Sequence, residues 1–435
     1  MKKGRHEPLL RVEKKTIPGQ IDVYVIPTKK FKTVLVTVLT RQVLSRELAP
    51  KTALLPSVME RGSRDYPTYR DLMIRLEELY GGGVSSDVMK KGEKQVLSFS
   101  MEVINDLYAP GQNLLREGIS MLGSVINHPL LENGGFKKDY VLQEKEQLAK
   151  EIKGLINDKV NYALERCVQE MCNTEPFGVF KYGSIEELEQ ITPEDLYAYY
   201  QQIMAENPLD IYIVGEVDPE DTFELVEDAF ARTNGKLRRE MPPDQVNYVP
   251  ADVRYHEEKL SVNQGKLTLG YRTNTTYSDD DYVSLLFYNG VLGSFPHSKL
   301  FQNVREKASL AYYAFSRLEK HKGIQLIGSG IELQNYNRAL EIITEQVEQI
   351  KKSEINHEEM ENTRRGLINQ FKVISDSPYS MLNLSLDGLM GGRLEGVDYY
   401  IRKLEEIGVD DVVAAANKVY LDTVYFLSAE EEVKA

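Results

Sequence analysis

Cysteine is scarce in this chain: its 435 residues include only Cys167 and Cys172. Both fall in a segment whose pattern predicts a helix, and their five-residue offset turns them to different faces at about 100° per residue. A disulfide is therefore not expected, and two small thiols in the core or on the surface are the simpler interpretation. This sparse use of cysteine agrees with a cytoplasmic location.

Long apolar runs are missing as well. The chain has no stretch of the length that crosses a bilayer as a helix, about 18 apolar residues. The basic residues Lys2, Lys3 and Arg5 are not followed by the apolar run of a secretory signal. We therefore expect no membrane segment, and the cytoplasm remains the expected location.

Histidine pairs are absent. No two histidines are three to five residues apart, so no single helix can present two imidazoles to a zinc ion. His256 and His357 each precede two glutamates, but one histidine beside acidic residues is usually part of a solvated face. We expect no metal site in this chain. The histidines are His6, His128, His256, His297, His321 and His357.

Positive charge is in the minority, with 53 basic residues against 67 acidic ones and a net charge of -14. This balance favours solubility and argues against nucleic acid as a partner, because phosphates would be repelled. The hydrophobic content of 42% and charged content of 28% are values of a globular protein. A chain of 435 residues exceeds one ordinary core, so two or more domains are expected.

The order of predicted elements repeats after about half the chain length. Thr192 can cap a helix that begins at Pro193, and the apolar, β-branched segment Leu209–Gly215 is typical of a strand. Ile407–Ala414 and Val424–Ser428 repeat this helix and strand near the end of the chain. An offset of this size indicates an internal duplication and not a solenoid.

The pattern predicts an α+β fold of two homologous domains, each an antiparallel-rich sheet packed with helices. The alternation of Leu97, Phe99, Met101 and Val103 with polar residues predicts a half-buried strand. Predicted strands lie at 21–26, 34–39, 97–103, 209–215, 266–271, 324–328 and 424–428, and helices at 50–61, 69–79, 107–127, 136–156, 281–292, 297–306, 336–352 and 357–374. The polar, Pro- and Gly-bearing stretch at 232–250 is the predicted linker between domains 1–231 and 251–435.

The segment from Ala53 to Ser63, with Tyr66-Pro67 after it, resembles the zinc segment of the pitrilysin/insulinase peptidases, which include the mitochondrial-processing-peptidase-like proteins. In that family the segment begins with H-x-x-E-H, two zinc ligands around a general-base Glu. The resemblance places these three residues at Ala53, Pro56 and Ser57. A methyl group, a ring without a carboxylate and a lone hydroxyl cannot replace them. On this register the chain is inactive alone.

A second element resembles the same family. Glu144 and Glu151 are seven residues apart on a predicted helix, like the family's E-x6-E, in which the first Glu is the third zinc ligand and the second supports it. Without the histidines we interpret both as vestigial. Taken without the resemblance, the segment is a charged amphipathic helix whose Glu and Lys side chains are solvated.

The third element is intact. Residues 298–313 closely resemble the family's S-R-L-F-x-x-[LV]-R-E-K-x-G-L-A-Y, which places Arg305 and Tyr312 on its Arg and Tyr. In active members this pair holds the substrate backbone and stabilises the oxyanion, for which a cation and a phenol donor are suitable groups. Ser309 stands where the family usually has Gly, so a turn with positive φ would be less comfortable here.

The resemblance covers most of the chain and implies a clamshell of related α+β domains, formed in some members by two different chains. This sequence fits the chain without the zinc motif. It would be a non-catalytic, substrate-binding subunit of a cytoplasmic heterodimeric zinc metallopeptidase that acts on peptides. The homologous partner would carry the zinc, and Arg305 and Tyr312 would act on it in trans. The substrate would add as a strand to a sheet edge.

Two alternatives remain open at this point. The first is a peptidase-like scaffold or binding protein without any role in catalysis, against which the retained Arg305 and Tyr312 argue. The second is an independent hydrolase with a new site, which the lack of a histidine cluster or nucleophile motif disfavours. The sequence does not identify the peptide substrate, the partner or the pathway.

Overall fold

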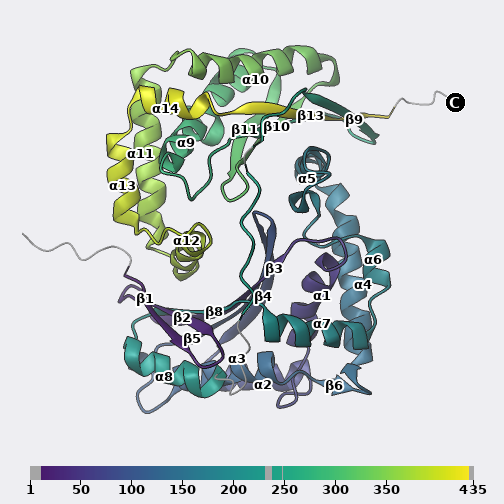
Figure 1. Cartoon of the computed structure of the whole chain (residues 1–435), viewed down its shortest axis with the longest axis vertical. Helices are drawn as coiled ribbons and strands as arrows, with labels where there is room; N and C mark the ends of the chain where they lie inside the picture. Colours follow the sequence, from purple (N-terminus) through teal and green to yellow (C-terminus); the bar gives the residue numbers. More distant parts are fainter. Residues whose placement is uncertain (1–10, 231–237, 247, 431–435) are drawn as a thin grey trace, which may run out of the picture. The chain divides into compact units, whose positions relative to one another are not determined.

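The computed structural model describes residues 11–230, 238–246 and 248–430, which are coloured along the chain in Figure 1. They divide into two compact units. The first unit consists of residues up to Lys153, Val179–Pro243 and Ser375–Ser385. The second consists of Gly154–Gly178, Asp244–Ile374 and the chain from Leu386 onward. In these described ranges no helix is long and apolar enough to cross a membrane.

The first unit contains a six-stranded sheet of order β1-β2-β8-β3-β5-β4, in which only β2 and β8 are parallel neighbours. The elements of the first half of the chain are β1 (Glu13–Ile17), β2 (Ile21–Pro27), β3 (Thr33–Val43), α1 (Ala49–Glu60), α2 (Tyr69–Glu78), β4 (Gly83–Lys91), β5 (Lys94–Ile104), α3 (Leu114–Asn127), β6 (Leu131–Glu132), β7 (Gly135–Phe136), α4 (Lys138–Gly154), α5 (Lys159–Met171), α6 (Ile185–Glu189), α7 (Pro193–Glu206), β8 (Leu209–Gly215) and α8 (Pro219–Phe230).

The second unit contains a five-stranded sheet of order β11-β12-β10-β13-β9, in which only β13 and β9 are parallel neighbours. The remaining elements are β9 (Arg254–Leu260), β10 (Gly265–Arg272), α9 (Tyr282–Asn289), π-helical segments at Gly290–Ser294 and Phe301–Lys307, β11 (Ala311–Glu319), β12 (Ile324–Ile331), α10 (Tyr336–Lys351), α11 (His357–Ile374), α12 (Pro378–Met390), α13 (Val397–Glu406), α14 (Val409–Ala416) and β13 (Tyr420–Ala429).

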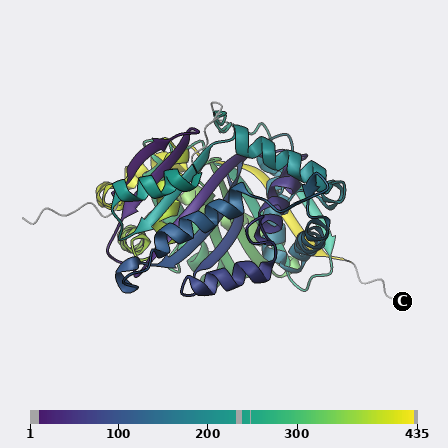
Figure 2. The same ribbon diagram turned by 90° about the horizontal axis from the view of Figure 1, so that it is seen from below.

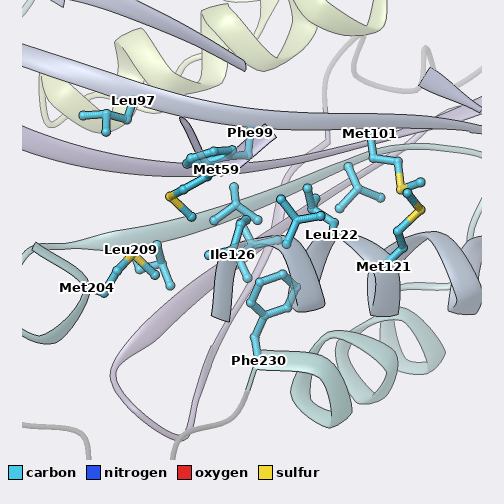
Figure 3. Close-up of a cluster of buried hydrophobic side chains, with 14 of the residues drawn as sticks. Met59, Leu97, Phe99, Met101, Met121, Leu122, Ile126, Met204, Leu209 and Phe230 are labelled. Atoms are coloured by element: carbon cyan, nitrogen blue, oxygen red, sulfur yellow. The ribbon is translucent and has the colours of Figure 1, made fainter. Parts of the chain in front are cut away.

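The core of the first unit lies between one face of its sheet and the helices on that face. Figure 2 shows α3 (blue) and α8 (teal) lying across the sheet, and Figure 3 shows Phe99, Leu122 and Phe230 meeting in the core. The predicted alternation along β5 is confirmed, because Leu97, Phe99, Met101 and Val103 all join this core. The expected half-burial is wrong: Ser98 and Ser100 on the other face are also buried.

The strand orders confirm the predicted duplication. The series β2-β8-β3-β5-β4 in the first sheet corresponds to β9-β13-β10-β12-β11 in the second, with the one parallel pair at the same place. Helix α7 before β8 corresponds to α14 before β13, as the sequence pattern indicated. The α+β fold with two homologous halves is therefore the observed one. Strand β1 has no counterpart in the second sheet's described strands.

The two halves exchange one segment each. Helix α5 precedes the predicted linker in sequence but belongs to the second unit, and the first part of α12 belongs to the first unit. The boundaries 1–231 and 251–435 therefore stay a prediction about the repeats in the sequence, whereas the compact units differ from them in these two segments. Residues 231–237 and 247, at and within the predicted linker, lie outside the described residues.

Close packing holds α5 on the second sheet. A Cβ atom at Gly270 of β10 would lie 2.6 Å from Sδ of Met171 and 3.4 Å from Sγ of Cys167. Glycine at this position therefore lets the helix approach the strand. Cys167 and Cys172 are buried thiols, and burial raises the pKa of Cys167. Both therefore behave as core residues.

Buried charges add a second attachment. Asp422 of β13 accepts a hydrogen bond from Nε of Arg272 at 3.0 Å and another from Arg254. Arg272 also pairs with Glu175, which follows α5, at 2.6 Å, and Lys322 pairs with the same carboxylate at 2.6 Å. Burial alone would raise the pKa of Glu175, but the bonds from Arg272 and Lys322 hold it below its usual range. The segment after α5 is thus tied to the second sheet by ion pairs.

We expect Asp422→Asn to lower the free energy of unfolding by about 3–5 kcal/mol, because the buried Arg272 loses one of its two ionic partners. Urea denaturation measures the loss. Asp280→Asn is the matched control, since Asp280 pairs with Arg393 at 2.9 Å but its side chain is fully exposed. The control should lose much less stability. Equal losses in the two variants would contradict the importance given to burial.

Candidate functional site

The segment that resembles the family's zinc motif begins on α1. Ala53 and Pro56 are buried against the first unit's core, and Ser57 is half-buried. Pro56 lies inside the helix, where it removes one backbone donor. Past the helix, a Cβ at Gly62 would lie 2.7 Å from the carbonyl oxygen of Pro67, which explains why glycine stands there. The residues that the register pairs with the zinc motif are therefore packed as ordinary helix positions.

A cation lies beside Glu144, which the resemblance aligns with the third zinc ligand. Glu144, on α4, is ion-paired with Nε of Arg61, the residue that follows the last turn of α1. The Glu144 side chain is 10% exposed and that of Arg61 is 38% exposed. A buried carboxylate needs a compensating positive charge. Here a guanidinium supplies that charge from within the chain.

Sequence reasoning overlooked Arg61. Ala53, Ser57 and Arg61 follow each other at intervals of four, so they share one helix face. The sequence offered one signal, an arginine one helix turn after Ser57. The pairing could not be predicted from it, because the sequence does not show that Glu144 faces that turn. The interpretation of Glu144 as a vestigial zinc ligand stays a prediction, and the structure adds that its carboxylate pairs with Arg61.

A second carboxylate lies beside this pair. Burial raises the pKa of Glu60, a hydrogen bond with Ser86 of β4 opposes that change, and the nearby Glu144 adds to it. Glu60 is thus the carboxylate of this group that takes up a proton more readily than usual. The site combines one ion pair and one easily protonated acid next to an edge strand of the sheet.

Glu151 does not join this group. Its side chain is exposed and accepts a hydrogen bond from Gln147 at 3.3 Å. Seven residues are about two helix turns, or roughly 10 Å along α4, so the two glutamates share a face but not a site. Across residues 11–230, 238–246 and 248–430, no group of three or more His, Cys, Asp or Glu side chains is placed to hold a metal ion. His6 lies outside these ranges.

Arg305 lies on the π-helical segment Phe301–Lys307 of the second unit. Its guanidinium carbon is 4.5 Å from the centre of the Phe301 ring, and its Nε is 3.8 Å from Oε1 of Glu306. The side chain is 43% exposed. This is a weakly paired cation that rests on an aromatic ring and reaches solvent. Short π-helical turns are frequent at functional sites.

Tyr312 lies on β11, an edge strand of the second sheet. The register of β11 against β12 shifts between Ala311 and Tyr313, so Tyr312 is the extra residue of a β-bulge, a feature that re-aims a side chain. Tyr312 is 54% exposed, and its hydroxyl donates to Oε1 of Glu332 at 2.6 Å. The hydrogen bond to Glu332 raises the pKa of the phenol.

Ser309 connects Arg305 to Tyr312 and has a φ of 53°, within the left-handed region. The expectation of a turn that serine fits less comfortably than glycine is confirmed. The turn is closed by a bond from the Leu310 amide to the Val304 carbonyl at 3.1 Å. It sets the direction in which the chain enters β11.

Known proteins resemble this chain along its whole length. Residues 190–367 match the family described as "Peptidase M16 inactive domain". The chain is 36% identical over 423 residues to the "probable inactive metalloprotease YmfF" of Bacillus subtilis, with 96% of this chain and 98% of that protein covered. These likenesses agree with the resemblance drawn from the sequence motifs.

Solved structures share the fold. A conserved protein from Enterococcus faecalis V583 has a TM-score of 0.89 and 30% identity, and the match covers 97% of this chain and 99% of that one. A protease from Helicobacter pylori has a TM-score of 0.79 at 17% identity, and the match covers 96% of this chain and 99% of that chain. The second likeness bears on the fold alone.

The Arg61–Glu144 pair generates a prediction about rebuilding a metal site. We expect the variant Ala53→His, Pro56→Glu and Ser57→His to bind zinc weakly, because Arg61 still occupies the carboxylate of Glu144. Adding Arg61→Ala should raise the affinity by about tenfold or more, in the range known for changes around metal ligands. Competition with a chromogenic chelator measures both. Equal affinities with and without Arg61 would show that it does not compete for Glu144.

The positive φ of Ser309 leads to a prediction about stability. Ser309→Gly should raise the free energy of unfolding by about 0.5–1 kcal/mol, because relief of the left-handed strain exceeds the entropy that glycine adds to the unfolded chain. Ser120→Gly, at an exposed position inside α3, is the control and should destabilise by a similar amount. A loss of stability in both variants would refute the strain argument.

Proposed function

Because this chain belongs to the peptidase M16 family as an inactive member, we propose that it is the non-catalytic, substrate-binding subunit of a heterodimeric zinc metallopeptidase. In this proposal Arg305 and Tyr312 complete the zinc site of a homologous partner, in the cytoplasm. One observation carries the proposal. Arg61 pairs with Glu144, the residue that the resemblance aligns with a zinc ligand, whereas the side chains of Arg305 and Tyr312 are exposed.

The division of chemistry follows from the groups present. The partner's zinc would activate a water molecule and polarise the scissile carbonyl. Arg305 would place a positive charge, and Tyr312 a hydroxyl donor, where negative charge develops on the carbonyl oxygen. A phenol has a single O–H donor, and in this structure the O–H of Tyr312 donates its hydrogen bond to Glu332. During turnover the O–H would turn from Glu332 to the oxyanion, and the hydrogen bond to Glu332 would be broken.

The substrate class follows from the sheet edges. Strand β11, which carries Tyr312, is an edge of the second sheet, and β4, which carries Ser86, is the corresponding edge of the first. An unpaired strand edge offers backbone donors and acceptors to an extended peptide. Recognition would therefore rest on the peptide backbone and depend little on the side chains. This supports peptides or unfolded segments as substrates.

One observation favours the alternative, a peptidase-like scaffold without a role in catalysis. The short bond from Tyr312 to Glu332 and the packing of Arg305 on Phe301 give both residues structural partners that need no substrate. A scaffold would keep them for local stability. The exposure of both side chains favours the catalytic proposal, because a purely structural pair gains little from contact with solvent.

The two accounts differ in the behaviour of assembled complexes. We expect Arg305→Ala or Tyr312→Phe to lower turnover per complex about a hundredfold, because each removes a donor that acts on charge formed in the transition state. Binding of an uncleaved peptide should weaken much less. The complex is obtained by co-purification with a homologous chain that has an intact H-x-x-E-H motif. Turnover is divided by the amount of complex, and melting checks stability.

Matched controls separate this effect from general perturbation. Arg338→Ala removes an exposed arginine of α10, and Tyr255→Phe removes an exposed hydroxyl of β9. Both controls should keep turnover near the wild-type value. Full activity per complex in the Arg305 and Tyr312 variants would leave the chain as a scaffold.

A further inference from the structure

The first unit has a cavity of 580 Å³ on the side of the fold where β3 begins and β8 ends. It is lined by the first turns of α3 and α8 and by the loop between β5 and α3. Glu60, Arg61 and Glu144 do not line this cavity, and neither do Arg305 and Tyr312. Its volume is in the range of small-ligand and peptide sites.

The inner wall of this cavity is apolar. Val34 and Leu115 are buried there, and Leu225 of α8 is half-buried beside them. Leu107 also lines the cavity and is 64% exposed, so it adds accessible apolar surface. An occupant would therefore need an apolar part to cover these side chains.

The rim is acidic. Asp106, Glu216, Asp218 and Asp221 line the cavity, and no basic residue does. Two of these carboxylates serve the fold: Asp106 accepts from the Leu114 amide at 2.6 Å, and Asp218 accepts from the first amides of α8. They are therefore held in place as fixed negative charges.

The negative charges of the other two carboxylates, Glu216 and Asp221, are only weakly compensated within the described part of the chain. No side chain in the described part of the chain pairs with the carboxylate of Asp221. Glu216 has Lys29 at 3.7 Å, but the Lys29 side chain is 87% exposed, so this pair is weak. The cavity thus combines an apolar wall with negative charge that the chain itself does not neutralise.

We propose that this cavity is a docking site for a basic segment of a partner protein, in which Lys or Arg alternates with aliphatic residues. Long basic side chains cover apolar surface with their methylene stems and keep the charged end at a polar rim. That chemistry matches Val34, Leu115 and Leu225 below Glu216 and Asp221. A metal ion fits less well, because these acids do not converge among the described residues. The proposal does not depend on the function proposed for Arg305 and Tyr312.

The test uses the full chain and a fluorescein-labelled probe peptide, Leu-Lys-Leu-Lys-Leu, measured by fluorescence anisotropy. The double variant Glu216→Gln, Asp221→Asn should weaken binding about five- to tenfold, the combined loss of two solvent-exposed charge pairs. Leu107→Ser, at an exposed position, should weaken it as well. The peptide Ser-Lys-Ser-Lys-Ser, of equal charge, should bind less tightly than the probe.

The control is the double variant Glu220→Gln, Glu224→Gln. Both residues are exposed on α8, Glu220 lies in the same first turn as Asp221, and neither lines the cavity. It removes the same net charge and should leave binding unchanged. Equal weakening by the two double variants would overturn the proposal, because binding would then follow net charge. Equal binding of the serine peptide, or unchanged binding in the cavity variant, would overturn it too.

Discussion

The carboxylate of Glu144 is largely buried between α1 and α4, and the guanidinium of Arg61 compensates it. A lone negative charge in that position would cost several kcal/mol. In this chain the guanidinium of Arg61 provides the compensating charge. The contact between the end of α1 and α4 therefore includes an ion pair that the chain supplies itself.

The same constraint operates in the second unit. Asp422 and Glu175 are compensated there by Arg272, Arg254 and Lys322, and the compensation joins the segment after α5 to the sheet. The halves nevertheless differ in what they retain. In the first half, the carboxylate of Glu144 is paired with Arg61. In the second half, the side chains of Arg305 and Tyr312 are exposed to solvent. A duplicated fold has thus been specialised in opposite ways in its two halves.

Local patterns predicted the parts of this fold that depend on neighbouring residues. The alternation in β5 and the capping of α7 at Thr192 follow from short-range rules. The left-handed turn at Ser309 was indicated by the family resemblance, in which glycine usually stands at this position. The edge strands β4 and β9 were harder to predict from the sequence. The burial pattern of β9 alternates between half-buried and exposed, and β4 begins at Gly83, the third of three consecutive glycines, so neither has a strong apolar signal.

Long-range contacts decided the rest. The pairing of Arg61 with Glu144 joins residues 83 positions apart, and the bulge at Tyr312 depends on its register against β12. The predicted helices at 281–292 and 297–306 are correct in place, but each includes or becomes a π-helical turn that periodicity does not reveal. The assignment of α5 to the second unit depends on Gly270, which leaves room for Met171 and Cys167.

The reciprocal exchange of α5 and the first part of α12 also orders events in time. During synthesis the first sheet is complete once β8 has emerged, but residues 375–385, which belong to the same unit, follow about 160 positions later. Helix α5 likewise packs against β10 and β13, which are synthesised after it. Contacts of such sequence separation slow folding and expose apolar surface meanwhile. The nascent first half is therefore an unfinished domain until the ribosome has nearly completed the chain.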